Sequence, residues 1–154
     1  MKTFEELKEE LLNRAKNANA CQNGYKMGLD AKNKADLLKA ITANWFWVLI
    51  DARIVDAIYL EENFTEEELS EAGIYTRKCH EVRTVSFACG SATVKAYGSA
   101  TVKACDSATV KACGDSYVED RTDNIRPGSD YAIVKDYYNH KIYIRKGKFE
   151  IIEV

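Results

Sequence analysis

Five cysteines and two histidines are the residues of this 154-residue sequence with the widest range of chemistry. Cys79 and His80 are adjacent and Cys89 follows them, which supplies three groups of the kind that bind zinc. However, the sequence contains no C-x-x-C pair, and no local pattern links His80 or His140 to a cysteine as its general base. We therefore expect no metal site, no cofactor and no thiol catalysis.

Carboxylates gather at residues 61–62 and 66–68. Both groups lie beside expected helix starts, where the helix dipole favours negative charge, so we assign them a structural role and not acid–base catalysis. No phosphate-binding glycine motif is present, because the glycines of the repeated region lie eight residues apart. The sequence thus predicts no catalytic, cofactor-binding or metal residue, and we expect that the protein is not an enzyme.

The most regular feature is an octad that fills residues 89–112 as CGSATVKA, YGSATVKA and CDSATVKA. In each copy Ala, Val and Ala alternate with Thr and Lys, so an extended strand has a small apolar side and a polar side. Gly98-Ser99 and Asp106-Ser107 are residue types that form corners. The polar sides of the three copies comprise Thr93, Lys95, Thr101, Lys103, Thr109 and Lys111.

Strand register decides how the octads are arranged. In an antiparallel meander Lys95 would pair with Val102, both faces would mix Lys with Val, and no core would form. In a parallel solenoid like residues stack on like, and the Ala-Val-Ala side fills a narrow interior. We predict the solenoid. The period leaves open whether a coil takes two octads or three. We favour two, because Ala and Val fill little volume, and Cys89 would then stack on Cys105.

The first half of the chain has helical periodicity. Thr3 with Glu6 forms a capping box ahead of a predicted helix over residues 4–19, and Thr65 with Glu68 forms a second one, in a helix that ends at Gly73. Residues 19–33 are expected to be a broken helix or turn. Residues 34–51 are expected to form one long helix, and residues 56–63 a short one.

Three adjacent aromatic residues, Trp45, Phe46 and Trp47, lie within the long predicted helix. They cannot all face one core, so we expect at least one to cover the junction with the second half or to be exposed to a partner.

The octad pattern fades at both of its ends. Upstream, residues 81–88 have the right length but place Val85 and Phe87 out of phase; downstream, Val118 is still in phase. The tail is expected to form a β-hairpin around Lys146-Gly147-Lys148 and to cap the stack. The predicted fold is α+β, with a helical head (1–76), a short parallel β-solenoid of octads (77–128) and a β-hairpin tail (129–154).

Charge and composition restrict the location and the partners. Through Tyr75 there are 14 Asp and Glu against 9 Lys and Arg, and in the remainder 10 against 13, so no dense basic face for nucleic acid is expected. The N-terminus has charges every few residues, unlike a signal peptide, and no apolar run has the length of a membrane span. We expect a cytoplasmic protein with free thiols and no membrane partner.

The segments ELLNRAKNANAC and WFWV, followed by G-S-A-T-V-K-A-Y octads, resemble a group of small proteins from gut bacteria and their phages. Those proteins carry variable numbers of G-[SN]-A-T-V-x-A-[YW] repeats. Here Cys stands at positions 89, 105 and 113, where that pattern has an aromatic residue, which leaves Tyr97 alone. The resemblance implies a bacterial host cell and a phage-encoded inhibitor of a host defence protein, such as an anti-CRISPR.

The sequence therefore favours a non-enzymatic protein-binding module. The alternatives are a structural protein that self-assembles into homo-oligomers and, less favoured, a Cys-dependent enzyme. Three outward lysines support only weak, salt-sensitive binding to nucleic acid. Regular Thr rows suggest ice binding, but the intervening Lys disfavours it, and a purely structural role for these rows is the simplest alternative. The predicted interaction surface comprises Thr93, Lys95, Tyr97, Thr101, Lys103, Thr109, Lys111, Trp45 and Trp47.

Overall fold

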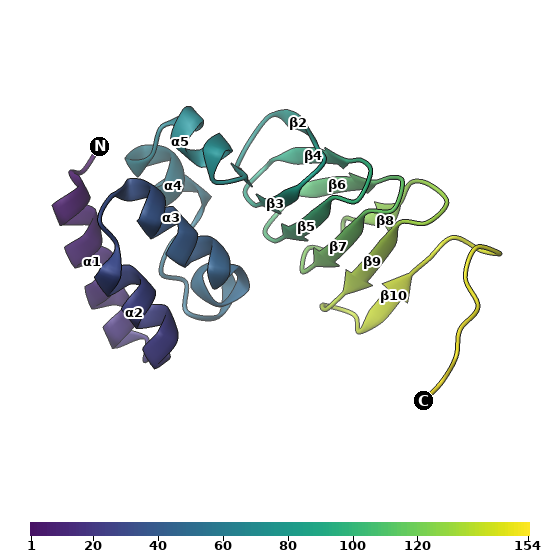
Figure 1. The fold of residues 1–154 in the computed structure, drawn as a ribbon, viewed down its shortest axis with the longest axis horizontal. Helices are drawn as coiled ribbons and strands as arrows, with labels where there is room; N and C mark the ends of the chain where they lie inside the picture. The colour runs from purple at the N-terminus through teal and green to yellow at the C-terminus, as the bar shows by residue number, and fades with distance from the viewer. The chain divides into compact units, whose positions relative to one another are not determined.

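The computed structural model describes residues 1–154 and divides into two compact units, Met1–Ile74 and Tyr75–Val154. The first unit is helical and the second is a β-solenoid (Figure 1). The α+β class predicted from the sequence is confirmed, with helices followed by parallel strands.

Capping boxes start two helices of the first unit, as predicted. The Thr3 hydroxyl accepts from the amide of Glu6 while the Glu6 carboxylate accepts from the amide of Thr3, and Thr65 and Glu68 repeat this arrangement. The elements of this unit are α1 (Phe4–Asn17), α2 (Gln22–Asp30), α3 (Lys34–Ala43), the π-helical turn η1 (Trp47–Asp51), α4 (Ala57–Asn63) and α5 (Glu66–Glu71).

Two helical predictions need correction. Residues 19–33 contain a nine-residue helix, α2, which is separated from α1 by a left-handed Asn19 (φ 58°) in a Schellman-type turn. The long helix predicted over residues 34–51 is interrupted. α3 ends at Ala43. The C-cap residue Asn44 donates its side-chain amide to the Ala40 carbonyl, and the chain continues into the wider η1 turn.

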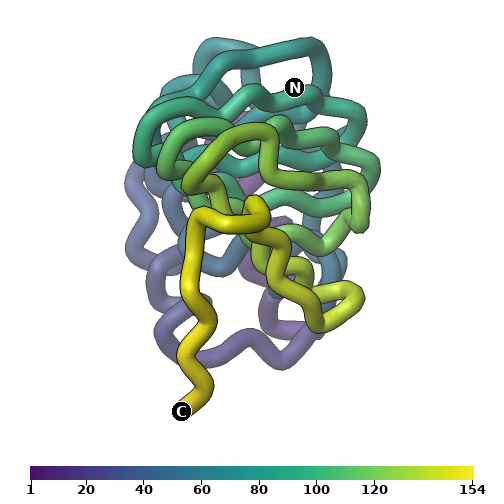
Figure 2. Tube along the Cα trace, turned by 90° about the vertical axis from the view of Figure 1, so that its right-hand side faces the viewer, coloured from purple at the N-terminus to yellow at the C-terminus, as the bar shows by residue number.

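The second unit winds through four coils, each contributing one strand to each of two sheets. Figure 2 looks along the stack and shows successive coils lying one behind another. One sheet has the order β2-β4-β6-β8 and the other β1-β3-β5-β7-β9-β10. The strands are β1 (Ile74–Tyr75), β2 (Cys79–Val82), β3 (Val85–Ala88), β4 (Thr93–Ala96), β5 (Thr101–Ala104), β6 (Thr109–Ala112), β7 (Tyr117–Asp120), β8 (Arg126–Pro127), β9 (Ile133–Asp136) and β10 (Lys141–Tyr143).

The register confirms two octads per coil. β4 pairs in parallel with β6, so that Thr93 lies beside Thr109, and the octad between them, β5, belongs to the other sheet. Interior Ala and Val side chains such as Val94 and Val102 are fully buried. Like residues therefore stack on like, and the narrow Ala-Val-Ala interior is the core of this unit.

The non-repeated coils place polar residues in this interior. The phase shift predicted for residues 81–88 is confirmed: Val85 is 59% exposed, and Ser86 takes the buried position beside Val102. Asp120 and Asp136 replace the last inward Ala of their strands and are buried. Each carboxylate accepts from a backbone amide two residues ahead, so each aspartate ends its strand by fixing the turn that follows.

The tail forms a hairpin, but at a different place from the one predicted. β10 pairs antiparallel with β9 across residues 137–140, and residues 144–154 form no strand around Lys146-Gly147-Lys148. The pairing follows the inward alternation, because Tyr143 lies beside Val134 and packs against the solenoid core. The solenoid thus extends to Asp136, beyond the predicted boundary at residue 128.

Candidate functional site

The octad side chains point alternately to two different outer faces. Lys95 and Lys111, with Thr93 and Thr109, lie on the four-stranded sheet. The same octad positions of the middle copy, Thr101 and Lys103, lie on the six-stranded sheet instead. Of the six Thr and Lys residues on the polar sides of the octads, the structure therefore brings four together on one sheet and places two on the other.

A row of three cations runs across the four-stranded face. Lys95 pairs with Lys111, and Lys111 pairs with Arg126 in β8, so the three lie on adjacent parallel strands about 4.8 Å apart. Neither lysine forms a salt bridge. Arg126 differs, because its Nη2 lies 3.4 Å from Asp123 Oδ1 and its guanidinium carbon lies 4.2 Å from the centroid of the Tyr143 ring. We name Lys95, Lys111 and Arg126 the basic row. On the other side of Lys95, its register partner in β2 is the acidic Glu81, so the row of cations ends there.

The octad pattern does not predict Arg126 as a member of this row. It occupies the row although it lies 15 residues after Lys111, and not 16, because residues 121–125 form an irregular corner. Only the pairing of β6 with β8 reveals its place.

The six-stranded face has alternating charge. Lys103, Glu119 and Lys135 follow one another on β5, β7 and β9. Hydrogen bonding to Tyr137 is the main cause that raises the pKa of Lys135 from its ordinary value. Apolar side chains also reach solvent on this face, with Val85 59% and Ile142 64% exposed.

The predicted aromatic position Tyr97 lies at a corner of the coil, outside both faces. The guanidinium of Arg83 stacks on its ring at 5.4 Å. Cys113 follows Tyr97 one coil later, and its amide donates to the Ala96 carbonyl. This corner holds one aromatic ring and no ladder of rings.

The cysteine and histidine groups considered from the sequence have structural contacts. His80 stacks on Tyr75 with ring centroids 4.4 Å apart, and its Nε2 lies 2.8 Å from the Arg77 carbonyl. Cys89 and Cys105 are buried at the corner that follows β3 and β5, and all five cysteines are free thiols. No group of three or more Cys, His, Asp or Glu side chains has an arrangement that could hold a metal ion.

The two tryptophans of the predicted surface differ in their surroundings. Trp45 is 1% exposed and belongs to the core of the helical unit. Trp47, two residues later, is half-buried and lines a pocket of about 270 Å³ within the same unit. Trp47 is thus half-buried within its own unit, and the expected role of an aromatic at the junction or toward a partner stays a prediction.

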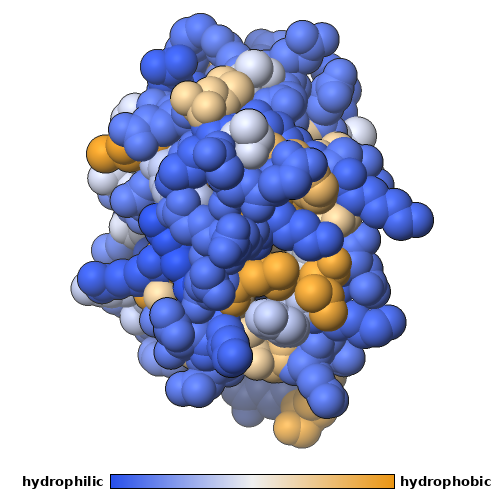
Figure 3. All heavy atoms as spheres, turned by 90° about the vertical axis from the view of Figure 1, so that its left-hand side faces the viewer, coloured by the Kyte–Doolittle hydropathy of each residue, from blue (hydrophilic) through white to orange (hydrophobic).

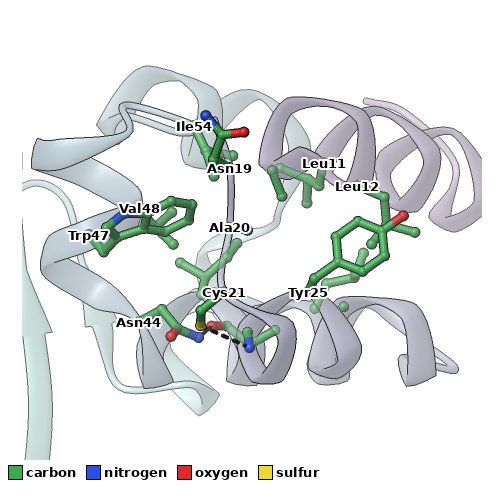
Figure 4. A pocket seen from close by; sticks show the side chains of 16 residues that line it. Leu11, Leu12, Asn19, Ala20, Cys21, Tyr25, Asn44, Trp47, Val48 and Ile54 are labelled. Carbon is green, nitrogen blue, oxygen red and sulfur yellow. Dashed lines mark hydrogen bonds between the residues drawn. The ribbon is translucent and has the colours of Figure 1, made fainter. Parts of the chain in front are cut away.

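The pocket lies among α1, α2, α3 and η1 (Figure 4). Leu11 and Leu12 come from α1, Tyr25 from α2, and Trp47 and Val48 from η1. Cys21 caps α2, its sulfur accepting from the Gly24 amide at 3.4 Å. The sequence does not predict this site when residues 19–33 are expected to be a broken helix or turn. The four-residue spacing of Gly24 and Gly28, which places both on one helix side, is the only indication of it.

One face of the molecule shows apolar side chains gathered in a patch within a largely hydrophilic surface (Figure 3).

None of the helices is both long and apolar enough to cross a membrane.

Comparison with known proteins gives no relative. No protein-family model, no curated protein and no solved structure matches the chain.

Proposed function

We propose that the chain is a non-enzymatic protein-binding module whose four-stranded solenoid face binds an acidic surface of a protein partner. The observation that carries this proposal is the basic row, three cations on adjacent strands of which two form no ion pair. Placing a carboxylate-rich surface against them would satisfy these charges and speed association.

The solenoid gives this face a fixed geometry. Each strand is hydrogen-bonded to its parallel neighbours in one register, and the interior side chains are close to fully buried. Lys95 and Lys111 therefore keep a constant backbone spacing, and the exposed Thr109 hydroxyl beside them can donate or accept hydrogen bonds. A pre-ordered surface loses little conformational freedom when it binds.

A protein fits this face better than a nucleic acid does. Binding to nucleic acid requires neutralising many phosphates, and a row of three cations ended by Glu81 neutralises few.

Pairing of strand edges into assemblies is less favoured. The four-stranded sheet ends in β8, which has only two residues, one of them Pro127. Short edge strands and proline are features that prevent edge-to-edge pairing. The six-stranded sheet ends in the hairpin strand β10, with Lys141 at its start.

Affinity capture with paired variants tests the proposal. Immobilised wild-type protein is compared with Lys95→Gln/Lys111→Gln and with the matched control Lys103→Gln/Lys135→Gln on the six-stranded face. We expect a protein that the wild type and the control retain and that the first variant loses, with retention falling as salt rises.

Other outcomes would contradict the proposal. Equal recovery by all three proteins would remove the basic row from recognition. Retention of duplex DNA instead of protein would favour a nucleic-acid ligand, and salt-dependent light scattering from the purified chain alone would favour self-assembly.

A further inference from the structure

We propose that the pocket of the helical unit binds a small, neutral, ring-shaped organic molecule. This site is separate from the basic row, and its function does not depend on the protein-binding proposal. Three properties of the pocket define the ligand: its volume, the absence of charge in its walls and the aromatic rings on opposite sides of it.

The volume sets the size of the ligand. The pocket measures about 270 Å³. An apolar cavity of about 150 Å³ accommodates benzene, so by proportion this pocket holds about eleven non-hydrogen atoms. A two-ring molecule of the size of indole matches that space, whereas a long acyl chain or a nucleotide exceeds it.

The walls set the charge of the ligand. None of the 16 lining residues is Asp, Glu, Lys, Arg or His. A charged group moved from water into such a site would lose its hydration without gaining an ion pair. The polar groups on the lining residues are all uncharged: the amide side chains of Asn19 and Asn44, the Cys21 thiol, the Tyr25 hydroxyl and the Trp47 indole N–H. The Asn44 amide nitrogen already donates to Ala40, and its oxygen is left as an acceptor.

Two aromatic side chains favour a flat ligand. Tyr25 of α2 and Trp47 of η1 lie on opposite sides of the pocket, with the leucines of α1 along another wall (Figure 4). Aromatic rings pack with each other in edge-to-face or offset geometry and contribute beyond the area they bury. An aromatic ligand between them gains contacts that an alkane of the same size does not.

The α2 wall explains how such a ligand could enter. α2 contributes no buried residue to the core, and Met27 and Leu29 on it are 41% and 50% exposed. Its inner side has glycines: a Cβ at Gly28 would lie 3.2 Å from Leu12, and one at Gly24 would lie 3.4 Å from the Asn44 oxygen. Little apolar burial holds this helix, so local opening there costs less than elsewhere in the unit.

Nuclear magnetic resonance titration of the full chain with indole tests the site directly. We expect saturable binding that shifts the amide signals of Gly24 and Gly28 and leaves those of Gly114 and Gly147 in place. Indole-3-carboxylate has the same ring system with a charge, and we expect its affinity to be at least tenfold lower.

A filling variant and its matched control locate the ligand. Ala40 lines the pocket and Ala35, on the same helix, is exposed. Ala40→Leu should lower the affinity for indole at least tenfold, because the added side chain occupies the space, and Ala35→Leu should leave it unchanged.

Three results would overturn the proposal. The first is the absence of saturable indole binding to the wild type, which requires no variant to fold. The second is equal affinity of both variants. The third is that a peptide with an exposed Trp shifts the amide signals of Gly24 and Gly28 whereas indole does not. That result would assign the pocket to a side chain of a protein partner.

Discussion

The two outer faces of the solenoid are built from the same octad and yet carry different charge patterns. On the four-stranded face Lys95 lies beside Lys111 and then Arg126, whereas on the six-stranded face Lys103 lies beside Glu119 and then Lys135. Consecutive octads alternate between the faces, so each octad lysine acquires neighbours from a different set of coils. The octads supply the strands of both sheets, and the unrepeated residues that pair with their lysines decide what each face can bind.

Both sheets pack on the same interior, so substitutions there should have the largest effect on the free energy of unfolding. Val110 is 3% exposed, and Val110→Asp places a carboxylate without partners in the Ala-Val core. We expect a loss of at least about 4 kcal/mol in the free energy of unfolding. The adjacent Thr109→Asp is the control and should cost less than about 1 kcal/mol. Urea unfolding followed by circular dichroism measures both; similar losses would show that the inward and outward assignments are wrong.

The two sheets end differently, because the six-stranded sheet ends in the β9–β10 hairpin and the four-stranded sheet ends in the short strand β8. Tyr143 packs against the solenoid core and under Arg126. Tyr143→Ala should lower the free energy of unfolding by about 1–2 kcal/mol, since the side chain is only half-buried. Tyr138→Ala, at a site 71% exposed in the same hairpin, should change it by less than about 0.5 kcal/mol. Equal thermal shifts for the two would argue against this packing.

The same hairpin should contribute to the acid sensitivity of the solenoid. Burial opposes ionisation of Asp136, but hydrogen bonds from Asn139 and Tyr138 outweigh it, so the pKa lies below its ordinary value of 3.8. A lowered pKa in the folded state stabilises the protein above the unfolded pKa, and that contribution disappears as the pH falls through the folded value. Asp136→Asn should therefore flatten the decline in melting temperature below about pH 5, where the unfolded chain begins to take up protons. An unchanged pH profile would contradict this.

The smallest effects should have opposite signs on the two faces. Lys111→Gln removes repulsion within the basic row and should raise the free energy of unfolding by about 0.2–0.5 kcal/mol. Glu119→Gln removes attraction to Lys103 and Lys135 and should lower it by a similar amount. Denaturation at low salt measures both, and about 1 M salt should abolish the difference. Shifts of the same sign would mean that the two faces do not differ in charge pattern as described.

The sequence predicts the repeated part of the fold well, and the reason is register. Once Val must stack on Val and Lys on Lys, only parallel coils keep Lys95 and Val102 on separate sides, and the small interior favours two octads per coil. Both features are present in the structure. The capping boxes at Thr3 and Thr65 were equally predictable, because their hydrogen bonds join residues three positions apart.

The unrepeated parts depend on contacts that a single sequence does not specify. The hairpin turn was expected at Gly147 but forms across residues 137–140, because inward packing of Tyr143 sets the strand phase. Arg126 joins the basic row through an irregular corner. The helical pocket depends on α2, whose glycines disfavour a helix by local propensity and are accommodated where the helix packs closely on Leu12 and Asn44.

Paired deletions test the central claim, that consecutive octads alternate between two faces, most directly. Removing residues 97–112 deletes two octads and keeps β7 on the six-stranded sheet, whereas removing residues 105–112 deletes one and moves β7 to the other sheet. Thermal unfolding followed by circular dichroism should show a cooperative transition near the wild-type temperature for the first deletion and a much lower or absent β-sheet transition for the second. Equal stability of the two deletions would contradict the account.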